Sequence, residues 1–388
     1  MPHFPKPFFK RGRGVWYVEI DRHQHNLGPD RDEAFRQYHE LMGQPREHKV
    51  SPQSLAAITD AFLEWVERNR SPDTYEWYRY RLQRFIERHP DLRASDLRPY
   101  HVQNWVDSYR LSVTSRRNYF RSVKRCMKWA KVQGYLDLNP IADMEVPRAE
   151  SNAVCILQQE FDTLMSHVRN REFADLLTVT WESGCRPQES LRVEARHVDI
   201  ANQRWVFPKS ESKMKRLTRV VYMTDTAMQI IRRLMLAYPK GPLFRNTSGR
   251  KWTKNSVNCG FLELQRRMGK DEMKRRGEEI SEEAITTLVP TLTSTGIRNG
   301  NVTPKTCAEL RCEAKRKLVC KRASELAPKY SLYTLRHSWA TNALKNGVDA
   351  LTVAILMGHE DPSTLAKVYQ HLSLNPQHLL EQARRAVS

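Results

Sequence analysis

Residues 330–372, YSLYTLRHSWATNALKNGVDALTVAILMGHEDPSTLAKVYQHL, decide how this chain of 388 residues is organised. Helix start and stop signals divide the stretch into predicted helices. The first covers roughly Leu332–Lys345 and stops at Gly347, a residue suited to a left-handed C-terminal cap. The second follows Asp349, which can act as N-cap, and stops at Gly358. The stretch is therefore helical with defined corners.

A third helix is predicted to begin at Asp361 as cap, with Pro362 in the first turn, where a missing N–H is tolerated. Polar side chains interrupt these apolar helices: Arg336, His337, His359 and Tyr369. Each has an ordinary explanation when taken alone. Tyr369 lies at core spacing, and a histidine after a glycine suits the exposed carbonyls of a helix end.

Taken together, these polar residues form an ordered pattern. Leu335-Arg336-His337-Ser338 is followed by Met357-Gly358-His359 and, ten residues later, by Tyr369. This pattern resembles the C-terminal signature of the tyrosine recombinase (phage integrase) family. The resemblance implies another arginine upstream, just after a helix that ends in a turn of small residues. Arg186, within ESGCRPQESL at 182–191, fits that position.

Arg186 also has a local structural context. Pro187 follows it at the first helical position, and Glu189 falls at the third. If Arg186 is the N-cap, the Glu189 carboxylate can reach back to its amide as half of a capping box. The positive end of the helix dipole would then add to the guanidinium in attracting a phosphate.

The family pattern further implies a lysine on the turn of a β-hairpin. Residues 204–207 and 218–223 are predicted strands, and Lys213 fits best in the turn between them. Lys209 and Lys215 remain alternatives, because the turn is about one residue longer than usual.

Net charge is the largest global signal of the chain. The 64 lysines and arginines exceed the 44 aspartates and glutamates by 20, an excess that attracts polyanions. An anionic membrane is the weaker candidate partner, since no apolar run of 18 residues, signal peptide or lipidation motif is apparent. The sequence therefore favours double-stranded DNA as partner, no membrane, and a cytoplasmic, nucleoid-associated location.

Seven cysteines are scattered along the chain, which favours reduced thiols over disulfides. Cys307, Cys312 and Cys320 lie in one stretch, but their spacing is not C-x2-C and no histidine is near. A zinc site there is the lesser alternative.

The expected fold class is mostly α with small β elements, in three domains. Residues 1–50 suggest a small β-sheet with one helix, similar to the arm-type DNA-binding module of integrases, with a decorative extension as alternative. Residues 52–146 read as an all-α core-binding domain. Residues 152–388 read as a mixed α+β catalytic domain of the tyrosine recombinase type. A long insertion around 246–329 departs from the family and is left open between an extra contact surface and a solvated loop.

A predicted helix over 115–133 carries positive charge and no acidic residue. Like charges one turn apart repel, and a phosphate backbone along the helix would relieve the repulsion. The candidate DNA-binding residues are Arg116, Arg117, Arg121, Lys124, Arg125 and Lys128. A solvated basic face is the alternative.

The resemblance implies metal-free phosphoryl transfer. Arg186 and Arg336 would neutralise charge on the phosphate, Lys213 would protonate the leaving oxygen, and His359 would donate a hydrogen bond. Tyr369 would attack phosphorus. Tyr333 stands where the family usually has histidine; a phenol titrates near pH ~10, so it is a poor base but can still orient a phosphate. No cofactor or metal is expected.

The implied product is a 3′-phosphotyrosyl enzyme with a free 5′ hydroxyl. Four protomers on two DNA sites would exchange strands through a Holliday junction, with accessory DNA-bending proteins as further candidates, to integrate or excise a mobile element. Two other functions stay open. A catalytically degenerate relative would bind DNA without cutting it, and a type IB topoisomerase-like enzyme would relax supercoils alone.

Overall fold

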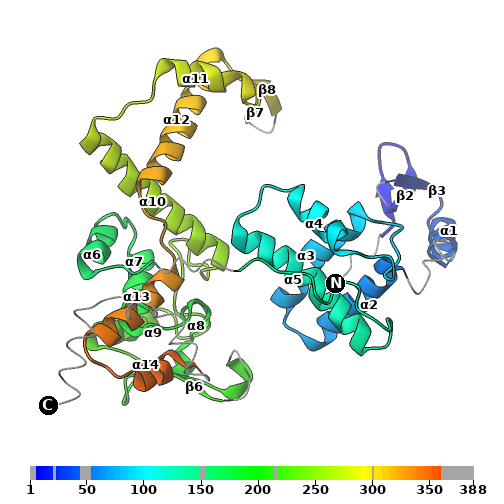
Figure 1. Ribbon diagram of the computed structural model, residues 1–388. Coiled ribbons are helices and arrows are strands. Elements are labelled where there is room, and N and C mark those ends of the chain that lie inside the picture. The colour runs from blue at the N-terminus through cyan, green and yellow to red at the C-terminus, as the bar shows by residue number, and fades with distance from the viewer. Residues whose placement is uncertain are drawn as a thin grey trace. The chain divides into compact units, whose positions relative to one another are not determined.

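In the computed structural model, residues 6–20, 23–43, 54–148, 154–212, 217–298 and 301–359 are described, and the chain divides into two units, Met1–Ser151 and Asn152–Ser388 (Figure 1). Helices dominate both units, and the described strands form three small antiparallel sheets. The predicted fold class, mostly α with small β elements, is confirmed. The division into three domains stays a prediction.

The N-terminal residues form a three-stranded sheet and one helix. The strands pair in the order β1 (Phe8–Lys10), β2 (Val15–Ile20) and β3 (His23–Gly28), and α1 (Arg31–Gly43) follows. Val18 and Leu27 are fully buried beneath the helix with Ala34. The predicted strand pair and helix are present, and β1 is an additional edge strand that the sequence did not signal.

Four helices build the rest of the first unit: α2 (Leu55–Asn69), α3 (Pro72–Arg88), α4 (Pro99–Asp107) and α5 (Val113–Val132). Ser54, Ser71 and Ser112 cap α2, α3 and α5 through side-chain oxygens that accept backbone N–H bonds, which satisfies donors left free at a helix start. Apolar side chains at helical spacing, such as Phe62, Phe85 and Phe120, meet in one core. This core fixes α5 with its basic residues on the outside.

The second unit is built around one larger core. Helices α6 (Gln158–Ser166), α7 (Arg171–Ser183) and α9 (Asp225–Ala237) pack with a sheet in the order β4 (Val198–Asp199), β5 (Arg204–Phe207) and β6 (Arg219–Tyr222). Trp205 and Phe207 alternate inward from β5, as a half-buried strand requires. The short helix α8 (Pro187–Arg192) joins α7 to this sheet.

Helices α13 (Leu332–Lys345) and α14 (Ala350–Met357) have the limits and caps that the sequence predicts. Gly347 has φ of +87°, and its N–H and that of Val348 bond back to the last turn of α13, which is a Schellman motif. Asp349 caps α14, and Gly358 ends it at φ of +68°. The predicted third helix, which includes Tyr369, lies outside the described residues.

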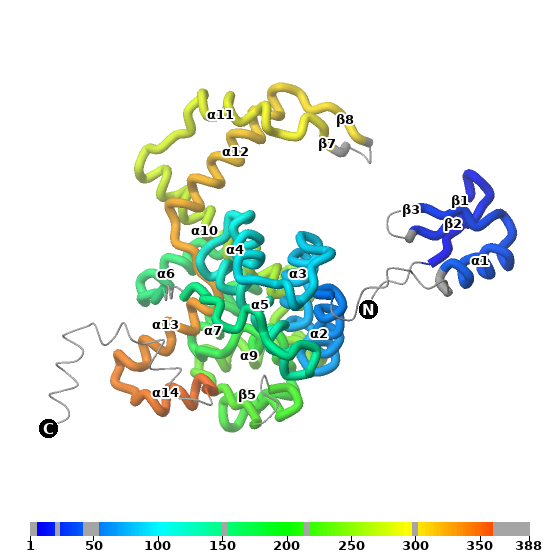
Figure 2. Tube along the Cα trace, turned by 45° about the vertical axis from the view of Figure 1, so that its right-hand side comes forward, coloured from blue at the N-terminus to red at the C-terminus, as the bar shows by residue number. Residues whose placement is uncertain are grey.

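The stretch that the sequence left open as an insertion is structured. Helix α10 (Lys254–Arg276) and helix α12 (Cys307–Leu326) run side by side and carry α11 (Glu282–Leu288) and the hairpin β7–β8 (Thr295–Arg298, Asn301–Pro304) at their far end. Figures 1 and 2 show these elements projecting from the rest of the second unit. We call this projection, residues 270–322, the arm. A solvated loop is excluded for its described residues.

The first part of the predicted insertion around 246–329 packs into the main core of the second unit. Val257, Phe261 and Leu264, on the first half of α10, belong to the main core of the second unit. The arm starts only where α10 leaves this core. At that point α10 and α12 touch closely, because a Cβ added to Gly269 would lie 1.8 Å from the Ala323 carbonyl oxygen.

Candidate active site

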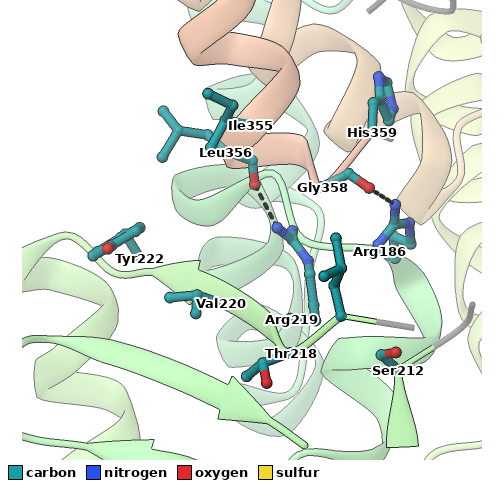
Figure 3. A pocket seen from close by; sticks show the side chains of 11 residues that line it. Arg186, Ser212, Thr218, Arg219, Val220, Tyr222, Ile355, Leu356, Gly358 and His359 are labelled. Carbon is teal, nitrogen blue, oxygen red and sulfur yellow. Dashed lines mark hydrogen bonds between the residues drawn. The ribbon is translucent and has the colours of Figure 1, made fainter. Parts of the chain in front are cut away.

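Arg186 is the N-cap of α8, as the sequence predicts. Its backbone N–H donates to Glu189 Oε2 at 2.8 Å, and its Nη1 donates to Glu189 Oε1 at 3.0 Å. Its Nη2 donates to the carbonyl oxygen of Gly358, at the end of α14 (Figure 3). The capping carboxylate therefore also orients the guanidinium.

Arg336 lies inside the second unit, with 3% of its surface exposed. Its Nη1 donates to the Gly184 carbonyl at 2.6 Å and its Nη2 to the Met357 carbonyl at 2.7 Å. Burial, reinforced by the charge of Arg186, lowers the pKa of Arg336 to about 10, so it remains charged at neutral pH. A buried guanidinium held at two nitrogens has little freedom to turn away.

Gly184 makes room for this arrangement. It ends α7 at φ of +57°, and a Cβ there would lie 2.5 Å from the ring of Trp339. The Trp339 Nε1 donates to the Glu182 carbonyl at 3.1 Å, which fixes the ring against the turn. The turn of small residues predicted before Arg186 is thus a close contact between α7 and α13.

His359 follows directly after α14. Arg336 Nη2 lies 3.3 Å from its Nε2, and since a guanidinium can only donate, Nε2 accepts and the neutral ring carries its proton on Nδ1. Burial, together with the charges of Arg336 and Arg186, lowers the pKa of His359 to about 4. The Nδ1 group has no hydrogen-bond partner among the described residues. His359 is therefore a neutral donor beside two arginines.

Three arginines converge on consecutive carbonyls at the end of α14. Arg219 donates to the Leu356 carbonyl and Arg336 to the Met357 carbonyl. Arg186 donates to the Gly358 carbonyl. These carbonyls lack partners within a helix and carry its negative partial charge. Five N–H groups on each guanidinium leave further donors for a ligand. A pocket of about 410 Å³ opens here, lined in part by Arg186, Arg219 and His359 (Figure 3).

Two predicted site residues, Lys213 and Tyr369, lie outside the described residues. The residues that flank the stretch 213–216, Ser212 and Leu217, both line the same pocket. The preceding turn is held by Glu211, whose carboxylate accepts from Arg196 Nη1 at 2.8 Å and lies 3.0 Å from His197 Nε2. The described residues on both sides of positions 213–216 therefore lie in the pocket wall.

Tyr333 stands apart from the other site residues. It lies in the first turn of α13 with 52% of its surface exposed, and its ring is 6.4 Å from that of His337. The structure brings Arg186, Arg336 and His359 together, but it gives Tyr333 no described contact with them.

Sequence reasoning missed Arg219 as a site residue and assigned Glu189 only a capping role. Arg219 is 7% exposed and Glu189 is 3% exposed, and Arg219 Nε donates to Glu189 Oε1 at 3.0 Å. Burial alone would raise the pKa of Glu189, but Arg219 and Arg186 outweigh it and keep that pKa below its usual value. A signal was available in the sequence, since Arg219 occupies an inward position two residues from Val221 in an alternating strand.

The predicted DNA-binding residues lie on α5 in the first unit. A groove of about 770 Å³ is lined by Trp77 and Tyr78 and by basic side chains of α5: Arg117, Arg121, Lys124, Arg125, Lys128 and Lys131. Two of these also bind the segment that follows α5, Arg117 at the Pro147 carbonyl (2.8 Å) and Lys124 at the Met144 carbonyl (2.6 Å).

The sequence suggested that the positive charge of α5 has no compensating carboxylate. One of its arginines does have such a partner. Arg116 Nη2 pairs with Asp107 Oδ1 of α4 at 2.6 Å, and Arg116 does not line the groove. The carboxylate comes from another helix, so the α5 sequence alone could not show it.

Elsewhere in the described part of the chain, no helix is long and apolar enough to cross a membrane. Cys307, Cys312 and Cys320 are spread along α12, and no cluster of metal-ligating side chains forms there or anywhere else among the described residues.

Comparison with known proteins gives consistent likenesses. The sequence profile described as "Phage integrase family" matches residues 305–375, which include Tyr333, Arg336, His359 and Tyr369. Tyrosine recombinase XerC of Oceanobacillus iheyensis is 22% identical over 339 residues, which are 82% of this chain and 92% of that protein.

Two solved structures share the fold at low sequence identity. The Tn1549 transposon integrase in complex with transposon right end DNA has a TM-score of 0.56 at 13% identity, over 85% of this chain and 99% of that one. A lambda integrase tetramer bound to a Holliday junction has a TM-score of 0.55 at 11% identity, over 94% of both chains.

Proposed function

We propose that this chain, which belongs to the tyrosine recombinase (phage integrase) family of DNA breaking-rejoining enzymes, is a site-specific recombinase that integrates or excises a mobile element. The observation that carries the proposal is the cluster of Arg186, Arg336 and His359 at the end of α14. Arg186 and His359 line one pocket, whose wall also includes both residues that flank the stretch containing Lys213. Such preorganised donors suit a phosphodiester that gains charge in its transition state.

The reaction exchanges ester bonds. The phenolic oxygen of Tyr369 attacks phosphorus and forms a P–O bond while the bond to the 5′ oxygen breaks; the phenol proton leaves to solvent, and Lys213 donates a proton to the departing oxygen. A 5′ hydroxyl of the partner strand then attacks the phosphotyrosine and displaces Tyr369, which regains a proton. Because no bond is hydrolysed, no nucleotide cofactor is needed.

Each described site residue has a role in this scheme. Arg186 and Arg336 use N–H groups not engaged by carbonyls to hold the non-bridging oxygens, and the neutral His359 donates a hydrogen bond from Nδ1–H to the phosphate. Tyr333 orients the phosphate from its half-exposed position. If a Tyr333→His variant loses all cleavage, that role is wrong.

The groove on α5 supplies contacts to DNA in addition to those of the reactive centre. Its cations neutralise the phosphate backbone without reading sequence, and the candidate contacts are Arg117, Arg121, Lys124, Arg125 and Lys128. We further propose four protomers on two DNA sites, a Holliday-junction intermediate and accessory DNA-bending proteins. The lambda integrase tetramer bound to a Holliday junction, whose fold this chain shares, supports that assembly.

A trapping experiment tests the proposal. Nicked suicide duplexes that tile the DNA flanking the gene are incubated with the protein, with Tyr369→Phe, and with Tyr238→Phe as a control outside the pocket. We expect a covalent adduct that persists in chelator, is lost only in Tyr369→Phe, and retains the fragment labelled at its 5′ end. An adduct carrying the other fragment would contradict a 3′-phosphotyrosine.

The same experiment separates the two alternatives. Tight, salt-sensitive binding with no adduct on any duplex would favour a DNA-binding relative that does not cut. An adduct with relaxation of supercoils and no joining of two defined sites would favour a topoisomerase-like enzyme. Joining of two element ends, rather than of two chromosomal sites, is the outcome expected for a mobile element.

A further inference from the structure

Arg219 links three segments of the second unit. It lies on β6, its Nε donates to Glu189 Oε1 at 3.0 Å and its Nη2 to Oε2 at 3.5 Å, and its Nη1 donates to the Leu356 carbonyl at 2.8 Å (Figure 3). It therefore connects β6 with α8 and with the end of α14. No other described arginine joins these three elements.

The carboxylate that Arg219 holds is the one that orients Arg186. Glu189 accepts from the backbone N–H and from Nη1 of Arg186 at 2.8 and 3.0 Å. A single carboxylate thus stands between two guanidinium groups in a site where all three side chains are largely buried. Without Arg219, Glu189 keeps its two hydrogen bonds to Arg186 but loses its connection to strand β6.

The far side of Arg219 is equally constrained. A Cβ added to Gly358 would lie 2.8 Å from Arg219 Nη1, and the Gly358 carbonyl is the acceptor for Arg186 Nη2. Arg219 consequently fills the space between the strand and the corner that precedes His359. A displacement of its side chain moves the acceptors of Arg186 on both sides.

We propose that Arg219 is a positioning residue that couples strand β6 to Arg186 and to the end of α14. It acts through Glu189 and the Leu356 carbonyl, and not by touching the phosphate. This inference rests on the proposed strand-transfer function. A misplacement of about 1 Å in such a site can cost roughly 10²-fold in rate.

The test uses Arg219→Gln and Arg219→Lys, with Arg204→Gln as the matched control. Arg204 lies on the neighbouring strand β5 and also pairs with a carboxylate, Asp199, at 2.8 Å. Single-turnover adduct formation is measured at saturating protein on the suicide duplex that the wild type cleaves. We expect a fall of about 10²-fold for Arg219→Gln, a smaller fall for Arg219→Lys, and an unchanged rate for Arg204→Gln.

Substrate chemistry separates positioning from loss of folded protein. A methylphosphonate at the scissile position removes one negative charge, so an ill-placed Arg186 matters less. A bridging 5′ sulfur leaves as thiolate without needing a proton, so a misplaced proton donor matters less. We expect the wild-type to variant rate ratio to shrink on at least one of these substrates. The same ratio on all three substrates would mean a purely structural role and would overturn the inference.

A double variant separates positioning from direct contact. Because Arg219 acts in part through Glu189, Arg219→Gln combined with Glu189→Gln should lose less than the product of the two single losses, whereas independent contacts would multiply the losses in full. Multiplied losses overturn the inference. If the wild type itself forms no adduct, the proposed function fails and this inference falls with it; if the wild type reacts, only the inference is at stake.

Discussion

The two basic regions of this chain use positive charge in opposite ways. In the second unit, Arg219 and Arg336 are buried, and with Arg186 they are tied to backbone carbonyls. On α5 the cations line an open groove, and only some of them have protein partners. Fixed guanidinium groups can stabilise a particular charge distribution, whereas groove cations supply affinity that salt weakens. Net charge alone does not distinguish these two uses.

Replacing Arg336 should have the largest effect on the reaction rate and so tests most directly whether the two regions differ. Arg336→Gln takes away an oriented donor, so we expect the adduct-forming rate to fall by about 10²–10³-fold while DNA affinity changes only a few-fold. The exposed Arg232→Gln on α9 is the control for loss of one positive charge. Gel-shift affinity and single-turnover rates on the suicide duplex check both values. A loss of affinity with an unchanged rate would place Arg336 in the same class as the α5 cations.

A glycine substitution tests whether orientation, rather than charge, is what the buried arginines contribute. Gly358→Ala forces an L-residue to φ of +68° and puts a Cβ against Arg219, while Gly277→Ala meets open space at φ of +66°. Both should lose about 1–2 kcal/mol of unfolding free energy for the left-handed backbone. Only Gly358→Ala should also lose about 10²-fold in cleavage rate. Equal rates for the two variants would show that the arginines tolerate displacement.

The groove on α5 should respond in the opposite way. Replacing Arg121 and Lys128 by glutamine removes two phosphate contacts, so the slope of log affinity against log salt should fall by about 1.8. The cleavage rate at saturating protein should stay as in the wild type. Salt titrations of DNA binding measure the slope, with Arg232→Gln and Lys240→Gln as the control pair. A changed cleavage rate at saturating protein would show that the α5 cations also contribute to the reaction, and would contradict the distinction between the two regions.

The smallest expected effect concerns the proton on His359. Its pKa of about 4 lies below the ordinary ~6.5, so between these values the unfolded chain binds a proton that the folded chain refuses. The stability that neutral His359 contributes is complete above pH ~6.5 and is lost as pH falls toward 4. His359→Gln should therefore make the loss of stability over this window less steep. Urea unfolding at pH 7.5, 6 and 5 measures how the free energy of unfolding changes with pH in the wild type and the variant. An identical change in both would contradict a neutral His359 in the folded protein.

Local signals accounted for most helix limits. Asp349 and Gly358 each act through neighbours within four residues, and each has the predicted role. The capping of Arg186 by Glu189 is equally local. Residues that act within one helical turn can be inferred from a single sequence, because the turn geometry fixes their distance.

Contacts between distant segments could not be inferred in this way. Arg219 meets Glu189 and Leu356 only because β6, α8 and α14 pack together. Asp107 neutralises Arg116 from a different helix for the same reason. A sequence shows that such charges exist, but their pairing is a property of the assembled core.

The arm was unclear from sequence for a different reason. Its helices bury few apolar side chains, with only Ala314 and Ala323 fully buried on the described part of α12, so the usual apolar stripe is missing. Ion pairs also connect segments of the arm, such as Arg322 with Glu278 and Lys305 with Glu313. Without an apolar stripe, the sequence left open whether this region is an extra contact surface or a solvated loop.

The close contact of Gly269 with Ala323 makes the arm a removable module. The chain enters and leaves the arm at one point, where Gln265 also bonds to the Ser324 and Ala327 carbonyls at 2.7 and 2.9 Å. Loop-closure entropy changes slowly with length, so a short linker between the two helices should close this junction without opening the main core. Evolution could therefore lengthen, replace or delete the arm while the arginine cluster stays intact. The same changes are open to protein engineering.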